Sequence, residues 1–458
     1  MPENGTAAEK SFISVRTDGL GERLQAVVNA AALASLCDAP FKFTWVFSEI
    51  YQRAQHEHAI RHPHDTFEAE YMAAHVLSED PGKLTVLNQT PRTIPQLKAL
   101  LAAAPIGLSV TNGYLTRLVT TDIETMHRVQ KEAFWGLGFL PDIRAAMERA
   151  RRVPMPGYPV AVHLRAGDII YGRYRFGPAF NGKALSYPVA KKIIADLVAQ
   201  GKYPVLFGQD DETCRLLVKP FGLKLGVDIL GAPDADPLAA ALSEIVLMSR
   251  CQAIYAGSSG FARIAAMISG QEIQSLAGIL SKADIVMTIE TEPDLADDSV
   301  LSDLQKAFSY YTAVHIGWPK YIQEARALPL IERAIHFDGF NPYYPIVRAA
   351  FLAALGRTKE AEAVAKAVVI RFVGVGGALG GLLTRTVTAK ARDGEGLWID
   401  PYLALLEKVA GRTTPYCQYL LTLADHARGR KSLALKHLAV AIAAAPDEVR
   451  FTELRQRL

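Results

Sequence analysis

The segment His163–Asp168 (His-Leu-Arg-Ala-Gly-Asp) combines side chains that could hold a phosphate-bearing substrate and react with it. It follows an apolar run that predicts a strand, and ligands of open α/β sheets bind at the carboxyl ends of strands. Arg165 can grip a diphosphate there with two parallel hydrogen bonds, and Gly167 lets the backbone come close. Asp168 can orient the arginine or contact the substrate. The alternative is a strand end with solvated charges, because so short a pattern can arise by chance.

The residues around this segment predict two α/β series that would position it. Residues Phe12 to Arg16 predict a strand, a glycine turn follows, and a long Ala/Leu/Val pattern from Glu22 to about Cys37 predicts a helix. This order is typical of a doubly wound α/β domain. Prolines and a glycine at 151–157 predict a linker, after which Tyr158–His163 begins the second series. Further strands are expected at Phe41–Phe47, 84–87, 106–110, 204–207, 253–256 and 274–277.

From about Leu301 onward, strand-like segments give way to alanine-rich helical pairs. Two stretches repeat the same residues at the same offsets: Pro342-Tyr343, Gly356-Arg357 and Ala361, then Pro415-Tyr416, Gly429-Arg430 and Ala434. They resemble tetratricopeptide repeats, whose small residues let paired helices pack closely. The glycine-rich stretch 374–381 is expected to interrupt this array.

Two glycine-bearing turns follow predicted strands. Residues 17–21 (Thr-Asp-Gly-Leu-Gly) belong to the first series, and residues 257–260 (Gly-Ser-Ser-Gly) follow the strand at 253–256. N–H and hydroxyl donors at the start of the next helix favour phosphate, because the helix dipole is positive there. We expect the phosphates of a bound substrate to contact Gly19, Gly21, Gly257, Ser258 and Ser259. A plain loop is the alternative for the second turn, and the first lacks the third glycine of a dinucleotide-binding fingerprint.

Together these motifs resemble those of the fucosyltransferase superfamily, which includes alpha-1,2-, alpha-1,6- and protein O-fucosyltransferases. The central segment resembles the superfamily's arginine motif, and Arg16–Leu24 resembles its glycine-rich opening. Glu244–Cys251 with Ala256–Phe261 resembles its late motif of an apolar helix, a strand and a Ser-Ser turn. Their order and rough spacing match across residues 10–285. Three residues depart from the pattern: Ala166 stands for a second arginine, Glu22 for asparagine, and Gly260 for an amide or aromatic residue.

The resemblance implies a transferase that uses GDP-fucose, inverts the anomeric carbon and requires no metal. It implies that Arg165 holds the donor phosphates, whose developing charge needs cationic and backbone donors. Asp210 or Asp211 would pair with guanine or ribose, although a helix-capping carboxylate is equally consistent with the position. The acceptor hydroxyl needs a carboxylate or imidazole as base. The candidates are Asp168, His163, Asp18 and Glu22, and His163 fits a supporting role equally well.

Two further segments have side chains suited to ligands. His56, His58, His62 and His64 are spaced as zinc ligands could be, but no cysteine joins them. A solvated loop in contact with the acceptor is the favoured interpretation. The segment Tyr171–Phe176 interleaves aromatic residues with arginines, which suits a loop facing sugar or phosphate. A nucleic-acid patch and a plain surface hairpin are its alternatives.

The composition is that of an ordinary globular protein. The chain has 458 residues, half of them hydrophobic, and a formal net charge of +3. The charge gives no global attraction to nucleic acid or an anionic membrane, and the four dispersed cysteines favour buried, reduced thiols. No secretory signal or membrane span is evident, so we expect a cytoplasmic protein without nucleic-acid partners.

We therefore predict the fold class α/β, with two Rossmann-like domains in the GT-B arrangement and an all-α helical-repeat domain. The expected boundaries are 1–152 for the acceptor domain, 153–290 for the nucleotide-sugar donor domain and 300–458 for the repeats. The predicted activity is transfer of fucose to a glycan or protein acceptor, with no cofactor besides the donor substrate. The repeats would bind a protein partner or hold a dimer together. Two alternatives remain: a transferase for another nucleotide sugar, and a non-catalytic scaffold with a degenerate transferase unit.

Overall fold

The opening residues form the predicted strand, glycine turn and helix. In the computed structural model, β1 (Ser11–Ser14) is fully buried, and α1 (Leu20–Cys37) begins after Gly19. Helix α1 is buried on nearly all sides, including the polar residues Arg23, Gln25 and Asn29. A helix with so wide an apolar surface must lie inside a protein, so α1 is a central element of the fold.

The structure describes residues 9–47, 60–231, 236–275, 279–297, 299–373, 381–391 and 396–458. The chain divides into two compact units. The first, which we call the sheet unit, comprises Met1–Arg165 and Ile194–Leu276. The second, the helical unit, comprises Ala166–Ile193 and Ala277–Leu458. Both predicted α/β series thus contribute to one unit, and part of the predicted donor domain belongs to the other. The three predicted domain boundaries remain predictions.

The first sheet is parallel and contains β1, β2 (Phe41–Thr44), β3 (Val76–Leu77), β4 (Thr85–Val86) and β5 (Gly107–Ser109). Its order is β3-β2-β1-β5-β4. The chain therefore proceeds from β1 to one side and later places β5 on the other. Such a switch point opens a crevice beyond the carboxyl ends of the two strands, where open α/β sheets bind ligands.

The second sheet repeats this arrangement with β6 (Pro159–Leu164), β7 (Tyr203–Gly208), β8 (Ile254–Ala256) and β9 (Ile273–Gln274). All three strand pairs are parallel and the order is β7-β6-β8-β9, so the switch point lies between β6 and β8. The predicted strand at 274–277 thus begins one residue earlier, and residues 276–278 lie outside the described residues.

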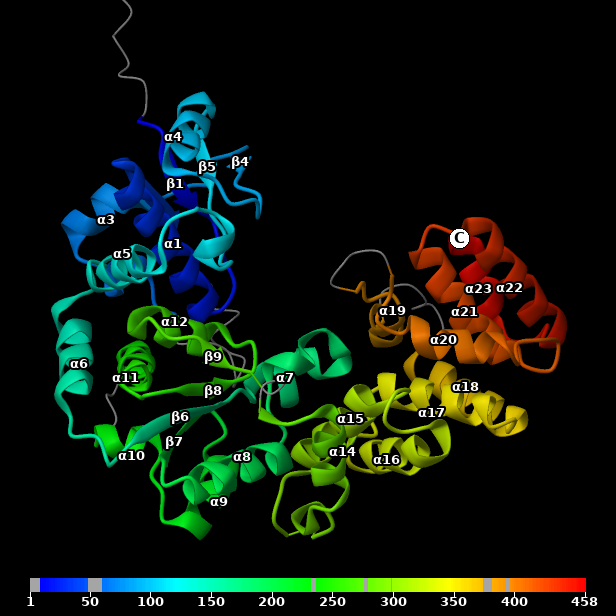
Figure 1. Cartoon of the computed structure of the whole chain (residues 1–458). Helices are drawn as coiled ribbons and strands as arrows, with labels where there is room; N and C mark the ends of the chain where they lie inside the picture. Colours follow the sequence, from blue (N-terminus) through cyan, green and yellow to red (C-terminus); the bar gives the residue numbers. More distant parts are fainter. Residues whose placement is uncertain are drawn as a thin grey trace, which may run out of the picture. The chain divides into compact units, whose positions relative to one another are not determined.

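Helices lie between the two sheets of the sheet unit (Figure 1). One continuous buried cluster includes residues of both sheets. Phe43 of the first sheet and Phe207 of the second belong to the same buried cluster. Helices α6 (Pro141–Arg152) and α11 (Pro237–Ser249) pack side by side, and Arg250 Nη1 donates to the carbonyls of Ala150 and Val153 at 2.7 Å. The remaining described helices of this unit are α3 (Ala69–His75), α4 (Ile94–Ala103), α5 (Ile123–Trp135), α9 (Asp211–Val218), α10 (Gly226–Leu230) and α12 (Gly260–Ser269), with the end of α8 (Tyr187–Ala199).

The helical unit consists mainly of helix pairs. Consecutive helices pack as α15 (Asp303–Gly317) with α16 (Glu324–Phe337), α17 (Tyr343–Ala354) with α18 (Thr358–Phe372), and α21 (Pro415–Ala427) with α22 (Lys431–Ala444). Gly356 and Gly429, the two matched turn glycines, both have φ of +75°, which favours glycine. The sequence repeat is therefore also a repeat of backbone conformation, whereas its assignment to tetratricopeptide repeats remains a prediction. Other described helices are α7 (Gly167–Ile170), α14 (Lys282–Glu290), α19 (Leu382–Val387), α20 (Asp400–Glu407) and α23 (Val449–Arg457).

The segment 166–193 leaves the sheet unit and packs on the helical unit. Ile169 and Ile170 of α7 form a small buried cluster with Phe308 of α15. Lys191 Nζ donates to Glu292 Oε1 and Asp294 Oδ2, each at 2.7 Å. These contacts explain why the segment belongs with the helices, although it lies within the second α/β series in sequence.

For two further sequence predictions, the structure gives information only on the residues that it describes. Of the glycine-rich stretch 374–381, residues 374–380 lie outside the described residues. Among the helices that the structure describes, none is long and apolar enough to cross a membrane.

Candidate functional site

The first turns of α1 and α12 meet through two glycines. A Cβ atom on Gly21 would lie 2.5 Å from both the carbonyl carbon of Gly260 and the backbone nitrogen of Phe261. A Cβ atom on Gly260 would lie 3.1 Å from the backbone nitrogen of Glu22. A side chain at position 21 would overlap the backbone of α12, and one at position 260 would crowd Glu22, so glycine at both positions has a packing reason. The N-terminus of α1, which follows a strand of the first sheet, thus lies next to the N-terminus of α12, which follows a strand of the second.

Glu22 joins the same two helices by hydrogen bonds. Its carboxylate accepts from Arg263 of α12 and from Asn112, which follows β5. The Glu22 side chain is 13% exposed and that of Arg263 17%, so solvent screens the ion pair only partly. Glutamate at this position therefore holds the β5 loop and α12 against α1, and these contacts leave it poorly placed as a general base.

Arg23 fixes the loop that leads into α1. Its guanidinium is buried and donates to the carbonyls of Thr17, Asp18 and Val46. It also lies over the ring of Trp45, with 5.7 Å between the guanidinium carbon and the ring centroid. One side chain thus holds the loops that follow β1 and β2 in a fixed relation.

Arg165 and the Gly257–Ser259 turn leave neighbouring strands at the same edge of the second sheet. His163 of β6 is paired in register with Ala256 of β8. Since the strands are parallel, Arg165, two residues on, and Gly257, one residue on, lie beyond adjacent carboxyl ends. Ser259 precedes α12 as its N-cap residue, but its side chain makes no capping hydrogen bond.

Three buried polar atoms near this edge have no hydrogen-bond partner among the described residues: His163 Nδ1, Ser259 Oγ and Arg263 Nε. Buried polar atoms are nearly always paired in native proteins. His163 and Ser259 are only 6% and 1% exposed. Unpaired buried polar groups on β6 and at the first turn of α12 are suited to a ligand with several acceptor oxygens.

His163 lies within the sheet instead of projecting from its end. Its ring stacks on Phe261 with centroids 5.5 Å apart and an interplanar angle of 17°. Burial, and secondarily the charge of Arg165, lower the pKa of His163 to about 3. The imidazole is therefore neutral near pH 7 and a weak proton acceptor, which favours the supporting role over that of general base.

Asp210 and Asp211 occupy the beginning of α9. Asp210 caps the helix, because its Oδ1 accepts from the backbone nitrogen of Thr213 at 3.1 Å. Asp211 pairs with Arg215 one turn later, with Nε to Oδ2 at 2.7 Å. The capping interpretation of Asp210 is thus confirmed, and contact with guanine or ribose remains a prediction.

Gly167 and Asp168 belong to the helical unit, whereas His163 and Arg165 belong to the sheet unit. Gly167 has φ of +25°, and Asp168 is 5% exposed within the short helix α7. A Cβ atom on Gly172 would lie 2.7 Å from the Asp168 Cα, so the backbone is tightly folded here. The predicted motif therefore spans the point where the chain passes between units, and the roles of these two residues remain predictions.

Asp18 lies in the loop before α1, one residue ahead of the N-cap Gly19. Arg16 donates to its carboxylate, with Nε to Oδ1 at 3.1 Å, and this hydrogen bond raises the pKa of Arg16. The Asp18 side chain is 40% exposed. Of the candidate bases in the sheet unit, Asp18 is thus the carboxylate that remains accessible at the edge of the first sheet.

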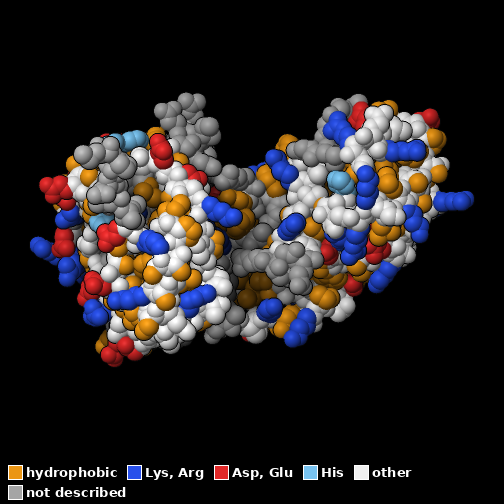
Figure 2. Space-filling view, turned by 90° about the horizontal axis from the view of Figure 1, so that it is seen from above, with side chains coloured by type: hydrophobic (Ala, Val, Ile, Leu, Met, Phe, Trp, Pro, Cys, Tyr) orange, Lys and Arg blue, Asp and Glu red, His pale blue; other side chains and the backbone are white. Residues whose placement is uncertain are grey.

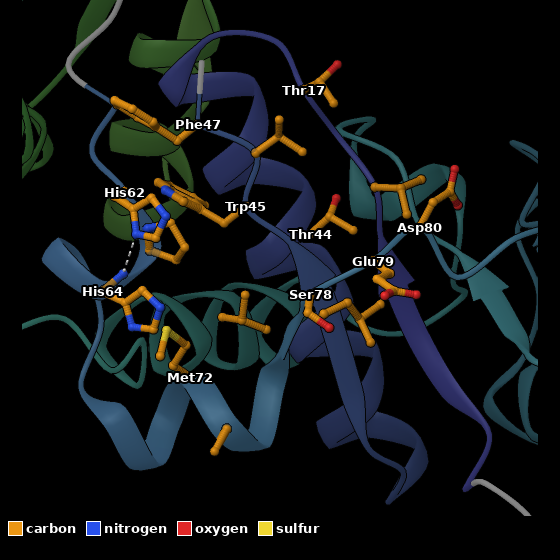
Figure 3. Close-up of a pocket in the computed structure, with 16 residues that line it drawn as sticks. Thr17, Thr44, Trp45, Phe47, His62, His64, Met72, Ser78, Glu79 and Asp80 are labelled. Carbon is orange, nitrogen blue, oxygen red and sulfur yellow. Dashed lines mark hydrogen bonds between the residues drawn. The ribbon is translucent and has the colours of Figure 1, made fainter. Parts of the chain in front are cut away.

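The same edge contains a cavity of about 790 Å³. It lies beyond the carboxyl ends of β1, β2 and β3 and is lined by sixteen described residues (Figure 3). His62 and His64 form part of its wall, with ring centroids 5.0 Å apart and an interplanar angle of 13°. His56 and His58 lie outside the described residues. No group of three or more metal-binding side chains occurs among the residues that the structure describes.

The aromatic and arginine-rich segment 171–176 belongs to the helical unit. Arg175 Nε lies 3.3 Å from the buried Asp338 carboxylate, and Asn341 Nδ2 donates to the Arg175 carbonyl at 2.9 Å. Tyr171 Oη lies 3.3 Å from Ser302 Oγ. These contacts within the helical unit give the segment a structural role. On the face drawn in Figure 2, Lys and Arg side chains are interspersed with acidic and hydrophobic ones.

Sequence reasoning did not identify the parts played by Arg23, Asn112 and Arg263. Arg23 stands among apolar residues of α1, and a charged residue within such a pattern signals a buried, paired guanidinium. Asn112-Gly113 after a predicted strand signals a turn. Neither signal identifies the partner, since the hydrogen bonds of Arg23 span up to 23 residues and the Arg263–Glu22 pair spans 241. All four cysteines are buried and free, as expected.

Comparison with known proteins gives distant structural similarities only. No family model and no curated protein match the chain. The fucosyltransferase NodZ from Bradyrhizobium is 13% identical with a TM-score of 0.35, covering 56% of this chain and 93% of that one. POFUT1 in complex with GDP is 12% identical with a TM-score of 0.31, covering 59% and 97%. Similarity this low does not establish a family, so the proposals below rest on the residues of this chain.

Proposed function

We propose that this protein is an inverting glycosyltransferase that transfers fucose from GDP-fucose to a glycan or protein acceptor. The proposal is carried by the contact between Gly21 and Gly260, which places the N-termini of α1 and α12 side by side. Each N-terminus has backbone N–H groups without intrahelical partners and a positive dipole end. A diphosphate is the ligand class that such a pair of helix ends suits best. The motif order supports GDP-fucose as the donor.

Arg165 and the serine turn complete this donor site in the proposal. When the bond between the anomeric carbon and the phosphate oxygen breaks, the electron pair passes to the nucleoside diphosphate. The Arg165 guanidinium would hold that charge, together with the backbone around Gly257, Ser258 and Ser259. The unpaired Ser259 Oγ and Arg263 Nε support a ligand at this position. Gly19, Gly21 and His163 would shape the site, and Asp210 would contact the nucleoside.

Asp18 is the proposed general base. The acceptor hydroxyl attacks the anomeric carbon opposite the leaving phosphate and gives its proton to a carboxylate. Asp18 is the exposed carboxylate next to the start of α1, and binding of the acceptor would replace its contact with Arg16. Asp168 remains a second proposed catalytic residue. No metal is proposed to take part.

Thermal unfolding of the full chain with GDP, UDP or ADP tests the donor class. A nucleotide that binds only the native state stabilises it by about 2.7 kcal/mol at a concentration 100-fold above its dissociation constant. We expect GDP to raise the melting temperature more than UDP or ADP. Preference for UDP would indicate another nucleotide sugar. No response to any of the three would favour the scaffold function, in which the repeated helix pairs bind a partner.

A further inference from the structure

The cavity beyond β1, β2 and β3 is lined mainly by apolar residues, and its carboxylates lie together. Of its sixteen described lining residues, nine are apolar, and several of these, such as Val15, Met72, Val76 and Leu77, are aliphatic. The Trp45 side chain is only 4% exposed, with Phe67 edge-on at 5.1 Å and Arg23 over the ring. The apolar lining is thus mainly aliphatic: Trp45 is covered by its neighbours, and Phe47 is the partly exposed aromatic ring among the described lining residues.

The ionisable side chains of the lining form two groups, and Thr17, Thr44 and Ser78 are further polar residues of the lining (Figure 3). His62 and His64 lie on one side, and His64 donates its backbone N–H to His62 Nδ1 at 3.4 Å. Glu79 and Asp80, which follow β3, lie on the other side and are exposed. No lysine or arginine occurs among the described residues that line the cavity. Its charge therefore favours a neutral or cationic ligand over an anionic one.

We propose that this cavity binds a peptide acceptor, with an apolar side chain between the aliphatic walls and a basic side chain beside Glu79 and Asp80. The inference rests on the proposed function and specifies its acceptor. A glycan would bring many hydroxyl groups against the nine apolar lining residues, which cannot pair with them, and unpaired polar groups are costly to bury. An apolar side chain has no hydrogen bonds to lose there, and the burial of its surface contributes favourably to the free energy of binding.

The position of the cavity connects it with the proposed donor site. Thr17 lines the cavity, and its carbonyl accepts from Arg23 Nη2 at 2.7 Å. The next two residues are the proposed base Asp18 and the N-cap Gly19 of α1. A peptide anchored in the cavity would therefore bring a neighbouring serine or threonine hydroxyl towards the start of α1, where the proposed donor phosphates bind.

Binding of defined probes to the full chain tests this inference. We would use three fluorescein-labelled probes: a 12-residue peptide with serine between leucines and arginines, the same peptide with glutamates for arginines, and an N-acetylglucosamine tetrasaccharide. Fluorescence anisotropy should show binding of the basic peptide, roughly tenfold weaker binding of the acidic one, and weakening of the former with salt. Failure of the basic peptide to bind, or tighter binding of the acidic one, would overturn the proposal.

Two adjacent alanines of α3 provide a matched pair of variants. Ala73 lines the cavity and Ala74 does not, and both are exposed, so tryptophan is tolerated at either position. Ala73→Trp should weaken the basic peptide roughly tenfold or more by filling the cavity, and Ala74→Trp should change affinity less than about twofold. Equal effects of the two substitutions would refute the assignment. So would tetrasaccharide binding that Ala73→Trp abolishes, since the acceptor would then be a glycan.

The acidic side is tested separately with Glu79→Gln/Asp80→Asn. Losing two exposed charges should weaken the basic peptide by about threefold and reduce its salt dependence. Glu70→Gln is the control and should have no effect, because Glu70 is an exposed acid of α3 outside the cavity. Stabilisation by GDP should persist in all these variants. Absence of that stabilisation in the unmodified protein would refute the proposed function. Unchanged affinity for the basic peptide in Ala73→Trp would refute the acceptor site alone.

Discussion

The two parallel sheets end in edges of opposite character. Beyond β6 and β8 of the second sheet lie Arg165, a Ser-Ser turn and the first turn of α12, all of which favour anions. Beyond β1, β2 and β3 of the first sheet lies a cavity with aliphatic walls, two histidines and two carboxylates. The same topology thus carries two different sets of side chains at its strand ends. The residues after each strand decide between them, because the strands only set where those residues lie.

The contact between α1 and α12 joins these two edges. Glycine at 21 and 260 allows the first turns to touch, and the Glu22–Arg263 ion pair holds them. A donor anion at the helix ends and an acceptor in the neighbouring cavity would then meet near Asp18. The following predictions would separate or confirm these assignments, in order of decreasing effect.

Removal of the Arg165 side chain should have the largest effect on the anion-binding edge. Arg165→Ala should weaken GDP binding by about 100-fold, since hydrogen bonds to charged groups contribute roughly 1.5–3 kcal/mol each. Isothermal titration calorimetry provides the measurement. Arg215→Ala is the control, because Arg215 is exposed on α9 and paired with Asp211. Unchanged GDP affinity in Arg165→Ala would remove the central residue of the donor site.

Crowding the contact between α1 and α12, which we call the junction, should lower both the stability of the protein and its affinity for the donor. In Gly21→Ala the added Cβ would lie 2.5 Å from backbone atoms of α12, so the helices must move apart. Overpacking of this kind typically costs about 1–3 kcal/mol, and thermal unfolding should show a lower melting temperature together with weaker GDP binding. Gly113→Ala is the matched control, because its nearest atom would lie at 3.5 Å, an ordinary contact. Loss of stability without loss of GDP affinity would separate the junction from the donor site.

The buried His163 predicts a pH dependence of stability. Its pKa falls to about 3 in the folded protein, whereas an unfolded histidine titrates near 6.5. The unfolded chain therefore binds more protons between these values, and stability is lost as the pH falls through this range. Between pH 7 and pH 5 this group should lower the free energy of unfolding by about 2 kcal/mol.

The variant His163→Phe isolates that contribution. Phenylalanine can keep the stacking on Phe261 and has no titrating group. Chemical unfolding at pH 7, 6 and 5 should show that the variant loses less stability than the unmodified protein as the pH falls. Parallel pH profiles would mean that the imidazole is already protonated, or accessible to solvent, at neutral pH.

Asp210 should produce the smallest effect and distinguishes capping from donor binding. Asp210→Ala removes the N-cap of α9 and should cost about 1 kcal/mol, whereas Asp210→Asn keeps a good capping residue. Melting temperatures and GDP affinities of both variants provide the test. If capping is the whole role, Asp210→Asn should match the unmodified protein in both measurements. A loss of GDP affinity in Asp210→Asn at unchanged stability would support contact with the nucleoside.

The elements of the sheet unit could be predicted because local patterns determine them. Alternating and apolar runs indicate β1, β2 and β6, and glycine turns mark the starts of α1 and α12. The matched glycines at 356 and 429 likewise identify equivalent helix turns. Sequence patterns did not predict that residues 166–193 belong to the helical unit. Their apolar side chains pack on α15, more than a hundred residues later in the chain, and sequence patterns do not specify such partners.

In the candidate site, too, the sequence indicated residue types but not the partners that lie far away in the chain. Arg165 and Ser259 could be identified by type and position, whereas the junction depends on pairs that are distant in sequence. Gly260 and Glu22 depart from the motifs that the sequence resembles, and contacts in the structure account for both: the glycine makes room for α1, and the glutamate binds Arg263 and Asn112. Conversely, capping explains Asp210 without any ligand.

The most direct test of the account is an experimental structure of the full chain with GDP bound. The diphosphate should lie at the first turns of α1 and α12, within hydrogen-bond distance of the Arg165 guanidinium and of donors from the 257–260 turn. The cavity between His62 and Glu79 should contain no phosphate. A diphosphate bound in that cavity, or bound away from both helix N-termini, would contradict the assignment of the two edges.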